Sequence, residues 1–254
     1  MYQTLPRPTI FAHRGASAHA PENTLASFQL AVQHNAPAIE LDAKLTADSE
    51  VVVIHDQTVD RTTDGTGTVR KLPLAALREF DAGTKFNPKY KGEKIPTLAE
   101  VFELIGNILF INIEITNYAS PLDDLPVKVA ELVKHHDLQE RVLFSSFYGL
   151  SLRRAHRLVP QVPLGLLAFP GFKGSFARSF LGKLTPYQAI HPEAGDVTPR
   201  LIERSHHDNR RVHTYTVNDP QIMRRLFSLG IDGIFTDDPL LALQVLAEST
   251  SSTP

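Results

Sequence analysis

The chain of 254 residues contains no cysteine and no tryptophan, and it has only 2 methionines. Without cysteine it has no disulfide, no thiolate zinc site and no cysteine nucleophile. It also lacks any run of 18 or more apolar residues, so no membrane-spanning helix is expected. Its first residues, Met1 to Pro8, have neither the basic start nor the apolar stretch of a secretory signal. We therefore expect a soluble, cytoplasmic protein.

An excess of positive charge is also missing. The sequence has 26 Lys and Arg against 28 Asp and Glu, a formal net charge of −2. Grooves for nucleic acid normally need a basic excess, so DNA and RNA are not expected as partners. The length and the 42% of hydrophobic residues are enough for one large core. What the chain does have is 11 histidines, several of them beside carboxylates.

Apolar or β-branched segments alternate with segments of helical periodicity along the chain. Strands are expected at Thr9–Ala12, Ala38–Lys44, Leu109–Ile115, Val142–Ser145, Pro163–Leu167, Ala189–Ile190, Arg211–Thr216 and Gly233–Thr236. Helices are expected at Thr24–His34, Leu98–Ile105, Leu125–His135, Leu150–Leu158, Ser175–Leu184, Pro199–His207, Pro220–Leu229 and Leu240–Ala247. This alternation favours an α/β fold, a (β/α)8 TIM barrel forming a single domain over residues 1–254. A doubly wound sheet is the alternative, because alternation alone does not close a barrel.

A long connection, residues 46–96, interrupts this rhythm after the second strand. A hairpin is expected through Ala47-Asp48-Ser49 into Val51–His55, followed by a stretch rich in Gly, Thr, Lys and Asp. Connections of this length in compact domains are usually functional, so we place this insertion at the catalytic face. Within it, Asp64-Gly65-Thr66-Gly67-Thr68 lacks the Lys-Ser/Thr of a phosphate-binding P-loop and is interpreted as loop geometry. At the other end of the chain, Ser249 to Pro254 is predicted to be a frayed tail.

Two acidic residues stand two positions apart in the second predicted strand, Glu40-Leu41-Asp42. Positions i and i+2 of a strand share a face, so both carboxylates project together. Two bare anions inside a barrel repel and are costly to desolvate, and a hard divalent cation, Mg²⁺ or Ca²⁺, removes that cost. A third carboxylate, Glu114, follows in the polar and apolar alternation of 111–115. Each strand alone is more simply interpreted as having a polar face, but the three acids together favour a metal site.

Two histidines follow predicted strands at their C-terminal ends, the face on which barrel enzymes carry their sites. His13-Arg14-Gly15 follows the first strand, and His55-Asp56 ends the hairpin. Histidine can donate or accept a proton near neutral pH, and Arg14 offers a fork of donors suited to phosphate. Either histidine alone would be interpreted as structural. Together with three acids on one face, they indicate a catalytic site.

The other histidines divide into two groups. His135-His136 and His206-His207 stand near ends of predicted helices, where a cation suits the helix dipole, and both pairs are expected at the surface. His191, between a short strand and Pro192, is a weaker candidate for the site. Pro21-Glu22-Asn23-Thr24 is interpreted as a helix start, with Asn23 or Thr24 as the cap and Glu22 complementing the dipole.

These motifs together resemble the glycerophosphodiester phosphodiesterase family. The matching strings are His13-Arg14-Gly15, Pro21-Glu22-Asn23-Thr24, Glu40-Leu41-Asp42, His55-Asp56, Asp60-Arg61-Thr62-Thr63-Asp64-Gly65-Thr66-Gly67, Ile95-Pro96-Thr97-Leu98, Asn112-Ile113-Glu114-Ile115, Tyr215-Thr216-Val217-Asn218 and 230–239. They run from about Ile10 to about Leu240, in order and at family spacing. Each string is short, but the set is specific.

The resemblance implies a TIM barrel that hydrolyses glycerophosphodiesters to glycerol 3-phosphate and an alcohol such as choline or ethanolamine. Its implied metal ligands, for Mg²⁺ or Ca²⁺, are Glu40, Asp42 and Glu114, and its implied acid and base are His13 and His55. The substrate-binding candidates are Arg14 for the phosphate, with Tyr215 and His191. In the mechanism usually drawn for this family, the glycerol 2-hydroxyl attacks phosphorus and water opens the resulting cyclic phosphate.

The sequence departs from the family pattern at two positions. Thr116 follows Glu114-Ile115 where the family commonly has lysine, which leaves Arg14 with more of the phosphate binding. Tyr215 stands where the family commonly has tryptophan, so an aromatic wall is kept and a hydroxyl is added that bears on substrate preference. Neither change removes an implied metal ligand or proton carrier.

A phenylalanine-rich segment is not accounted for by the family pattern. Phe169, Phe172, Phe176 and Phe180 lie close to the basic residues Lys173, Arg178 and Lys183. The last three phenylalanines are spaced four apart, on one face of a helix, and a barrel helix packing on strands is the plainer interpretation. The alternative is an apolar, basic lip that accepts an acyl chain or makes transient contact with a lipid surface.

Three functions therefore remain open. The first is metal-dependent hydrolysis of small-molecule glycerophosphodiesters. The second keeps the barrel and the histidines but makes the protein a lysophospholipase D, or a phospholipase C-like lyase that stops at the cyclic phosphate. The third, prompted by the missing lysine, is a non-catalytic barrel that binds phosphodiesters.

Overall fold

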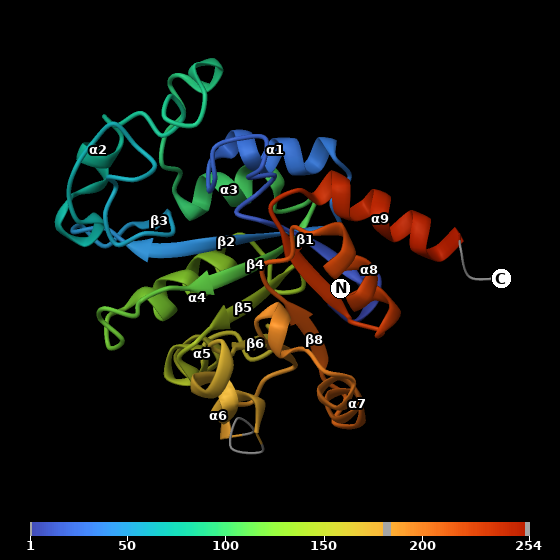
Figure 1. Cartoon of the computed structure of the whole chain (residues 1–254). Coiled ribbons are helices and arrows are strands. Elements are labelled where there is room, and N and C mark those ends of the chain that lie inside the picture. Colours follow the sequence, from blue (N-terminus) through green and yellow to red (C-terminus); the bar gives the residue numbers. More distant parts are fainter. Residues whose placement is uncertain (1, 180–183, 252–254) are drawn as a thin grey trace.

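The computed structural model describes residues 2–179 and 184–251, and its centre is a closed barrel of parallel strands (Figure 1). The barrel strands, in order around it, are β1 (Thr9–His13), β2 (Ala38–Leu45), β4 (Phe110–Ile115), β5 (Val142–Ser146), β6 (Leu164–Leu167), β7 (Ala189–His191), β8 (Arg211–Thr214) and β9 (Gly233–Thr236). Because β1 pairs with both β9 and β2, the ring is closed. The predicted TIM barrel is confirmed, and the doubly wound alternative is wrong.

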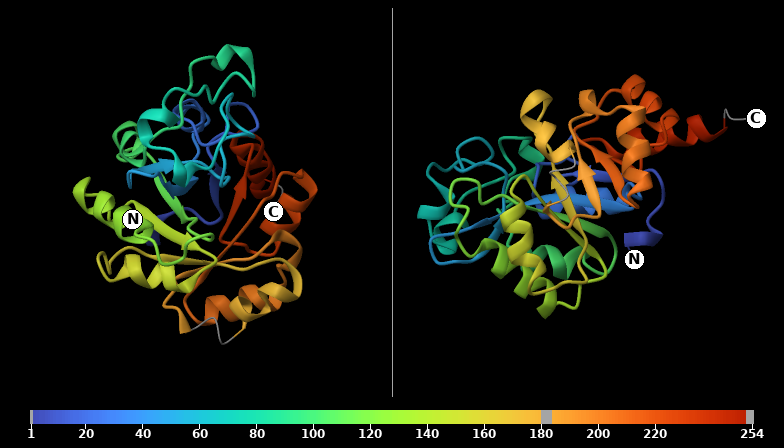
Figure 2. Two further views of the ribbon diagram at one scale, coloured as in Figure 1. Left: turned by 90° about the vertical axis from the view of Figure 1, so that its left-hand side faces the viewer. Right: turned by 90° about the horizontal axis from the view of Figure 1, so that it is seen from below.

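Helices follow the strands and cover the outside of the barrel (Figure 2). They are α1 (Leu25–Gln33), α3 (Leu98–Ile105), α4 (Leu125–His135), α5 (Gly149–His156), α6 (Ser175–Arg178), α7 (Pro199–His207), α8 (Pro220–Ser228) and α9 (Pro239–Ser251). Thr24 caps α1 by accepting a hydrogen bond from the Ser27 amide, as expected. Among residues 2–179 and 184–251, no helix is long and apolar enough to cross a membrane.

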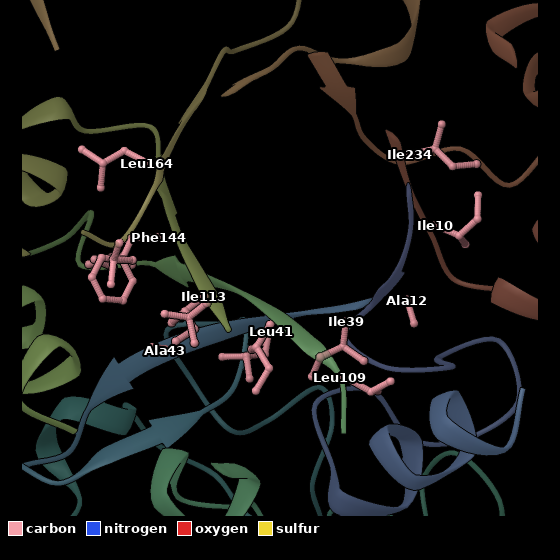
Figure 3. Packing of buried hydrophobic residues seen from close by; sticks show 14 of the residues in the cluster. Ile10, Ala12, Ile39, Leu41, Ala43, Leu109, Ile113, Phe144, Leu164 and Ile234 are labelled. Carbon is pink, nitrogen blue, oxygen red and sulfur yellow. The ribbon is translucent and has the colours of Figure 1, made fainter. Parts of the chain in front are cut away.

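Alternation along the strands separates the apolar core from the barrel interior. In β2, Ile39, Leu41 and Ala43 belong to the large core packed against the helices. Figure 3 shows Leu41, with Leu164 of β6 and Ile234 of β9, pointing away from the barrel interior. Glu40, Asp42 and Lys44 occupy the other face of β2, because a strand turns successive side chains to opposite faces. The sequence pattern of β2 thereby aims three charged side chains into the barrel.

The barrel interior is apolar at one end and polar at the other. Phe11, Phe110, Leu143 and Phe235 form a separate cluster inside the barrel, and Tyr2 packs against it. The next inward positions of β4 and β5 are Asn112 and Ser145, and the Asn112 side chain donates to Ser145 Oγ over 2.8 Å. Polar side chains therefore gather at the C-terminal ends of the strands, above an apolar plug.

The insertion lies over the end of β2 and has a core of its own. Its first strand, β3 (Val51–Val53), pairs antiparallel with β2, which confirms the predicted hairpin. Beyond it the chain forms α2 (Leu74–Leu77). A small cluster fills the insertion, namely Val52, Ile54, Val59, Val69, Leu77, Ala82 and Ile95. In Figure 1 the insertion, in teal, stands on the side to which the arrowhead of β2 points.

Two helix predictions differ from the structure. The helix predicted over Ser175–Leu184 ends at Arg178, after which Ser179 has extended backbone and donates both its amide and its hydroxyl to Phe176 O. Phe180 and Lys183 lie outside the described residues. The predicted tail from Ser249 is helical as far as Ser251. There Ser249 and Thr250 donate their hydroxyls to the carbonyls of Val245 and Ala247, which keeps these polar residues compatible with α9.

Candidate active site

Three carboxylates meet at the C-terminal ends of β2 and β4. Glu40, Asp42 and Glu114 each place one oxygen within 4.8 Å of the others. Asp42 pairs in register with Glu114 across the two strands, which brings residues 72 positions apart side by side. Glu40 and Asp42 are almost fully buried, at 3% and 1% exposed. A donor set made only of carboxylate oxygens fits a hard divalent cation such as Mg²⁺ or Ca²⁺.

Burial and mutual repulsion shift the pKa values of the three clustered carboxyls. Burial, then repulsion by Asp42, raises the pKa of Glu114 to about 7. Burial, with repulsion by Asp42 and Glu114, also raises the pKa of Glu40 well above its usual range. Burial acts on Asp42 in the same direction, but Arg14 and His55 outweigh it and lower the pKa of that carboxyl. A bound cation would favour the ionised form of all three groups.

A strained turn after β1 aims Arg14 at this cluster. Arg14 has a φ of +55° and Gly15 a φ of +84°, both in the left-handed region. A Cβ at Gly15 would lie 2.4 Å from Ser27 Oγ, so a side chain there would collide with α1. The turn lets the Arg14 amide donate to Glu40 over 3.1 Å, while its guanidinium lies 3.4 Å from Asp42. Left-handed backbone at a non-glycine residue is typical of functional sites.

His13 is held by a carboxylate from the last strand of the barrel. Its Nδ1 lies 2.6 Å from Asp237 Oδ1, and its Nε2 lies 3.9 Å from Glu40. Asp237 also accepts hydrogen bonds from Asn218 and Ser17. The hydrogen bond of His13 to Asp237 orients the imidazole and leaves Nε2 on the side of the carboxylate cluster.

His55 is held differently, through a chain of charged groups in the insertion. Its Nδ1 lies 2.7 Å from Asp56, and Arg61 donates to Asp56 over 2.6 Å. Arg61 also donates to both oxygens of Glu22, which accepts a further hydrogen bond from Arg14. The bonds from Arg61, with those from His55, lower the pKa of Asp56 to about 2. Glu22, expected to complement a helix dipole, instead joins Arg61 to Arg14.

Nearly all of the candidate residues border one cavity of about 180 Å³. Its lining residues include His13, Arg14, Glu40, His55 and Glu114, and also His191 and Tyr215. Asp42 does not line the cavity but lies in the carboxylate cluster and accepts a 2.9 Å hydrogen bond from Asn23. The structure thus brings together every candidate that the sequence identified.

Besides Tyr215, the cavity lining includes the apolar side chains of Phe147, Leu167 and Phe235. The Tyr215 hydroxyl donates to the carbonyl of Ala168 over 2.7 Å, and its ring lies edge-on to Phe147 with 6.2 Å between centroids. The hydroxyl that distinguishes tyrosine from tryptophan is therefore engaged by the protein backbone. A ligand would meet the ring of Tyr215 rather than a free hydroxyl.

His191 lies deep in the cavity beside a second buried histidine. It is fully buried, and its Nε2 is 3.3 Å from His213 Nδ1. Burial lowers the pKa of His191 to about 3, so the ring is neutral at physiological pH. Its Nδ1 has no hydrogen-bond partner within the described part of the chain, and neither does Oδ1 of Asn112. His135, His206 and His207 are exposed and His136 is partly buried, so the two surface pairs are largely as expected.

One cation near the cluster escaped the sequence reasoning. Lys44 is 5% exposed and donates to Thr116 Oγ1 over 2.8 Å, so its ammonium occupies the neighbourhood of the position where the family commonly has lysine. Burial lowers the pKa of Lys44, while Asp42 and Glu114 act to raise it. The sequence pattern does indicate this position, because Glu40, Asp42 and Lys44 are alternate residues of β2 and therefore lie on the same face of the strand.

Four other residues complete the site and were not singled out as functional. Tyr118 donates to Glu114 over 2.6 Å, and Asn23 donates to Asp42. Asp237 and Arg61 position the two histidines. Of these, Arg61 stands close to His55-Asp56 in the sequence, where charge alternation was visible. Tyr118 and Asp237 carry no such signal, since their partners are set by loop and barrel geometry.

The sequence matches one family model over most of its length. Residues 13–241 match the model described as the glycerophosphoryl diester phosphodiesterase family. A glycerophosphodiester phosphodiesterase of Caldanaerobacter subterraneus subsp. tengcongensis is 40% identical over 231 residues, covering 91% of this chain and 94% of that protein. Another from Bacillus altitudinis is 35% identical over 243 residues, covering 94% and 98%.

Solved structures agree with this comparison. An Oleispira antarctica phosphodiesterase, in complex with the product sn-glycerol-3-phosphate, superposes with a TM-score of 0.87 at 31% identity, covering 97% of this chain and 98% of that one. A glycerophosphodiester phosphodiesterase from Agrobacterium tumefaciens superposes with a TM-score of 0.81 at 30% identity, covering 92% and 99%.

Proposed function

The chain belongs to the glycerophosphoryl diester phosphodiesterase family and is a phosphoric diester hydrolase, and from this we propose that it hydrolyses glycerophosphodiesters to glycerol 3-phosphate and an alcohol. The observation that carries the proposal is the cavity lined by two carboxylate-held histidines and by Glu40 and Glu114 of the carboxylate cluster. The sn-glycerol-3-phosphate bound to the Oleispira antarctica relative supports the choice of product.

Substrate binding is assigned to the polar side of the cavity. Arg14 is held by Glu22 and by the carboxylate cluster, which leaves its planar guanidinium fixed for a phosphate oxygen. A Mg²⁺ or Ca²⁺ ion held by Glu40, Asp42 and Glu114 would neutralise charge that develops on the phosphate during transfer. The ring of Tyr215 and the neutral His191 border the rest of the cavity and are proposed to contact the glycerol moiety.

Proton transfer is assigned to His13 and His55. The reaction needs one proton removed from the attacking oxygen and one given to the leaving alcohol oxygen. Both histidines line the same cavity, and each has its Nδ1 engaged by an aspartate, so that Nε2 is the atom available for substrate. Because the two imidazoles are held by different aspartates, one can act as the base while the other acts as the acid.

The attacking oxygen is proposed to be the glycerol 2-hydroxyl. Its attack on phosphorus expels the alcohol and forms a five-membered cyclic phosphate. Water then opens the ring by the reverse set of proton transfers and leaves glycerol 3-phosphate. A phosphodiester without a free 2-hydroxyl is therefore expected to resist hydrolysis.

Release of glycerol 3-phosphate from glycerophosphocholine, measured with added Mg²⁺ or Ca²⁺ and again after EDTA, tests the proposal. His13→Ala and His55→Ala are expected to lower kcat by at least about 100-fold while the thermal transition is retained. Phosphocholine, or a cyclic phosphate as the final product, would contradict the proposed reaction. Tight binding of glycerophosphocholine by wild-type protein without any turnover would instead favour the non-catalytic phosphodiester-binding barrel.

A further inference from the structure

An aromatic surface leads out of the catalytic cavity. Phe147 lines the cavity, and its ring stacks on Phe169 with 4.2 Å between centroids and 21° between planes. Tyr118 and Tyr215 contact the other sides of Phe147 edge-on, at 5.6 Å and 6.2 Å. Phe169 follows β6, so the surface continues from the cavity wall onto the loop after that strand.

The segment after β6 carries three phenylalanines, Phe169 and Phe172 before α6 and Phe176 within it, which we call the aromatic lip. They are 43%, 91% and 56% exposed. The expectation that this face packs on the barrel strands is therefore wrong for Phe172 and Phe176. Burying a phenylalanine side chain stabilises a protein by about 2–3 kcal/mol, so exposing three in one short segment forgoes a large stabilisation. Exposed apolar surfaces of this kind mark binding sites.

Polar contacts hold the loop in this conformation. Arg178 donates to Asp196 over 2.8 Å and to the Phe169 carbonyl over 3.0 Å. The Gly171 amide also donates to Asp196 over 2.8 Å. These bonds consume Arg178, which was expected to make the lip basic, and leave Lys173 as an exposed cation of the described segment. The lip is therefore tied to Asp196 by hydrogen bonds and is mainly apolar.

We propose that the aromatic lip binds the hydrocarbon chain of a 1-acyl lysophospholipid whose phosphodiester occupies the catalytic cavity. This inference rests on the proposed function and extends its substrate class. Continuity from Phe147 to Phe169 favours a chain attached to the reacting molecule over a separate protein partner. Pairing of Arg178 with Asp196 disfavours an anionic lipid surface, which would require free positive charge.

The chemistry is unchanged for this substrate. A 1-acyl lysophospholipid keeps its free 2-hydroxyl, which forms the new bond to phosphorus as the bond to the head-group alcohol breaks. The alcohol oxygen takes a proton from one histidine, and the other histidine takes the proton of the 2-hydroxyl. Water then opens the cyclic phosphate, so the products are acylated glycerol 3-phosphate and the free alcohol.

Initial rates with glycerophosphocholine and with monomeric 1-acyl lysophosphatidylcholines of increasing chain length test this proposal. For the first several carbons, kcat/KM is expected to rise by about 2–4-fold per methylene. Phe172→Ser and Phe176→Ser are expected to lower kcat/KM for an eight-carbon chain by at least about 5-fold and to leave glycerophosphocholine turnover unchanged. Ile108→Ser is the matched control, because Ile108 is 56% exposed, like Phe176, but precedes β4 at the opposite end of the barrel.

The outcomes separate this inference from the proposed function. Hydrolysis of glycerophosphocholine with no gain from the acyl chain, or equal loss on both substrates in the variants, would overturn the lip while leaving the proposed function intact. A third outcome is that Phe172→Ser leaves the kinetics on monomeric lysophosphatidylcholine unchanged and reduces binding to phosphatidylcholine vesicles. That result would make the lip a bilayer contact and would also overturn the proposed acyl-chain site. Hydrolysis of neither substrate would remove the proposed function itself.

Discussion

His13 Nδ1 lies 2.6 Å from Asp237 Oδ1, although the two residues are 224 positions apart in the chain. Closure of the barrel through β1 and β9 creates this pair, since His13 ends β1 and Asp237 follows β9. His55, by contrast, is held by its immediate neighbour Asp56. The two proposed proton carriers thus depend on different parts of the structure, and each can be perturbed alone.

Asp237→Asn is expected to lower kcat by about 100-fold or more, with little change in KM, because His13 loses the carboxylate that sets its tautomer and stabilises its charged form. Initial rates across pH 5–9 measure this. The control is Asp238→Asn, since Asp238 contacts His19 and accepts the Leu241 amide at the start of α9. Equal loss in both variants would mean that Asp237 acts through local folding rather than through His13.

Arg61→Gln is expected to lower kcat by about 10-fold and to raise KM, because Arg61 donates to both Asp56 and Glu22 and so supports His55 and Arg14 together. A variant with normal kinetics would contradict this coupling. Arg78→Gln is the matched control, because Arg78 is another arginine of the insertion, paired with Glu100 at the start of α3. It is expected to affect thermal stability more than rate.

Lys44→Met is expected to weaken binding of the phosphodiester and to strengthen binding of the divalent cation. Loss of a buried cation beside Asp42 and Glu114 should raise KM for the phosphodiester and tighten binding of the divalent cation. Isothermal titration with Mg²⁺ or Ca²⁺ and initial rates measure the two effects. Lys94→Met, which removes a lysine bonded to carbonyls within the insertion, is expected to change neither. Weaker binding of both ligands would indicate collapse of the site instead.

Metal-free protein is expected to lose stability as the pH rises from about 6.5 to 8.5. The pKa of Glu114 is raised to about 7 and that of Glu40 is raised well above its usual range, so the folded state binds more protons than the unfolded state in this window. The free energy of unfolding therefore falls with rising pH, by about 1–2 kcal/mol. Below this window the lowered pKa values of His191 and His213 act oppositely, since these rings fold in the neutral form.

Thermal unfolding in EDTA at several pH values measures this dependence. Added Mg²⁺ or Ca²⁺ is expected to raise the transition temperature more at pH 8.5 than at pH 6.5, because binding requires ionised carboxylates. Glu114→Gln should flatten the pH dependence and reduce the effect of the cation. A cation effect independent of pH, or one retained in Glu114→Gln, would place the ion elsewhere.

Much of the site could be inferred from short-range patterns. Side chains of a strand alternate between its two faces, so the pattern Glu40-Leu41-Asp42 predicts that Glu40 and Asp42 share a face whatever the fold. The positions of His13 and His55 after strands likewise place them at the catalytic end of a barrel. Lys44 follows the same period-2 pattern, which places it on the same face of β2 as Glu40 and Asp42.

Other features could not be read from neighbouring residues. The exposure of Phe172 and Phe176 did not follow from their spacing of four residues, because α6 spans only Ser175–Arg178 and Arg178 donates to Asp196. The hydroxyl of Tyr215, which follows β8, donates a hydrogen bond to the carbonyl of Ala168, which follows β6. Such pairings depend on the final positions of separate strands, and local propensity does not specify those positions.

The sequence by itself determined the alternation of strands and helices, the polar face of β2 and the chemical types of the candidate residues, because alternation and spacing act over a few residues. It also excluded disulfides and cysteine chemistry through the absence of cysteine. Only the tertiary structure decided which groups meet: His13 with Asp237, Arg61 with Glu22, and Lys44 with Thr116. The physical reason is that barrel closure and strand register bring distant residues within hydrogen-bonding distance, and neither is encoded in any one segment.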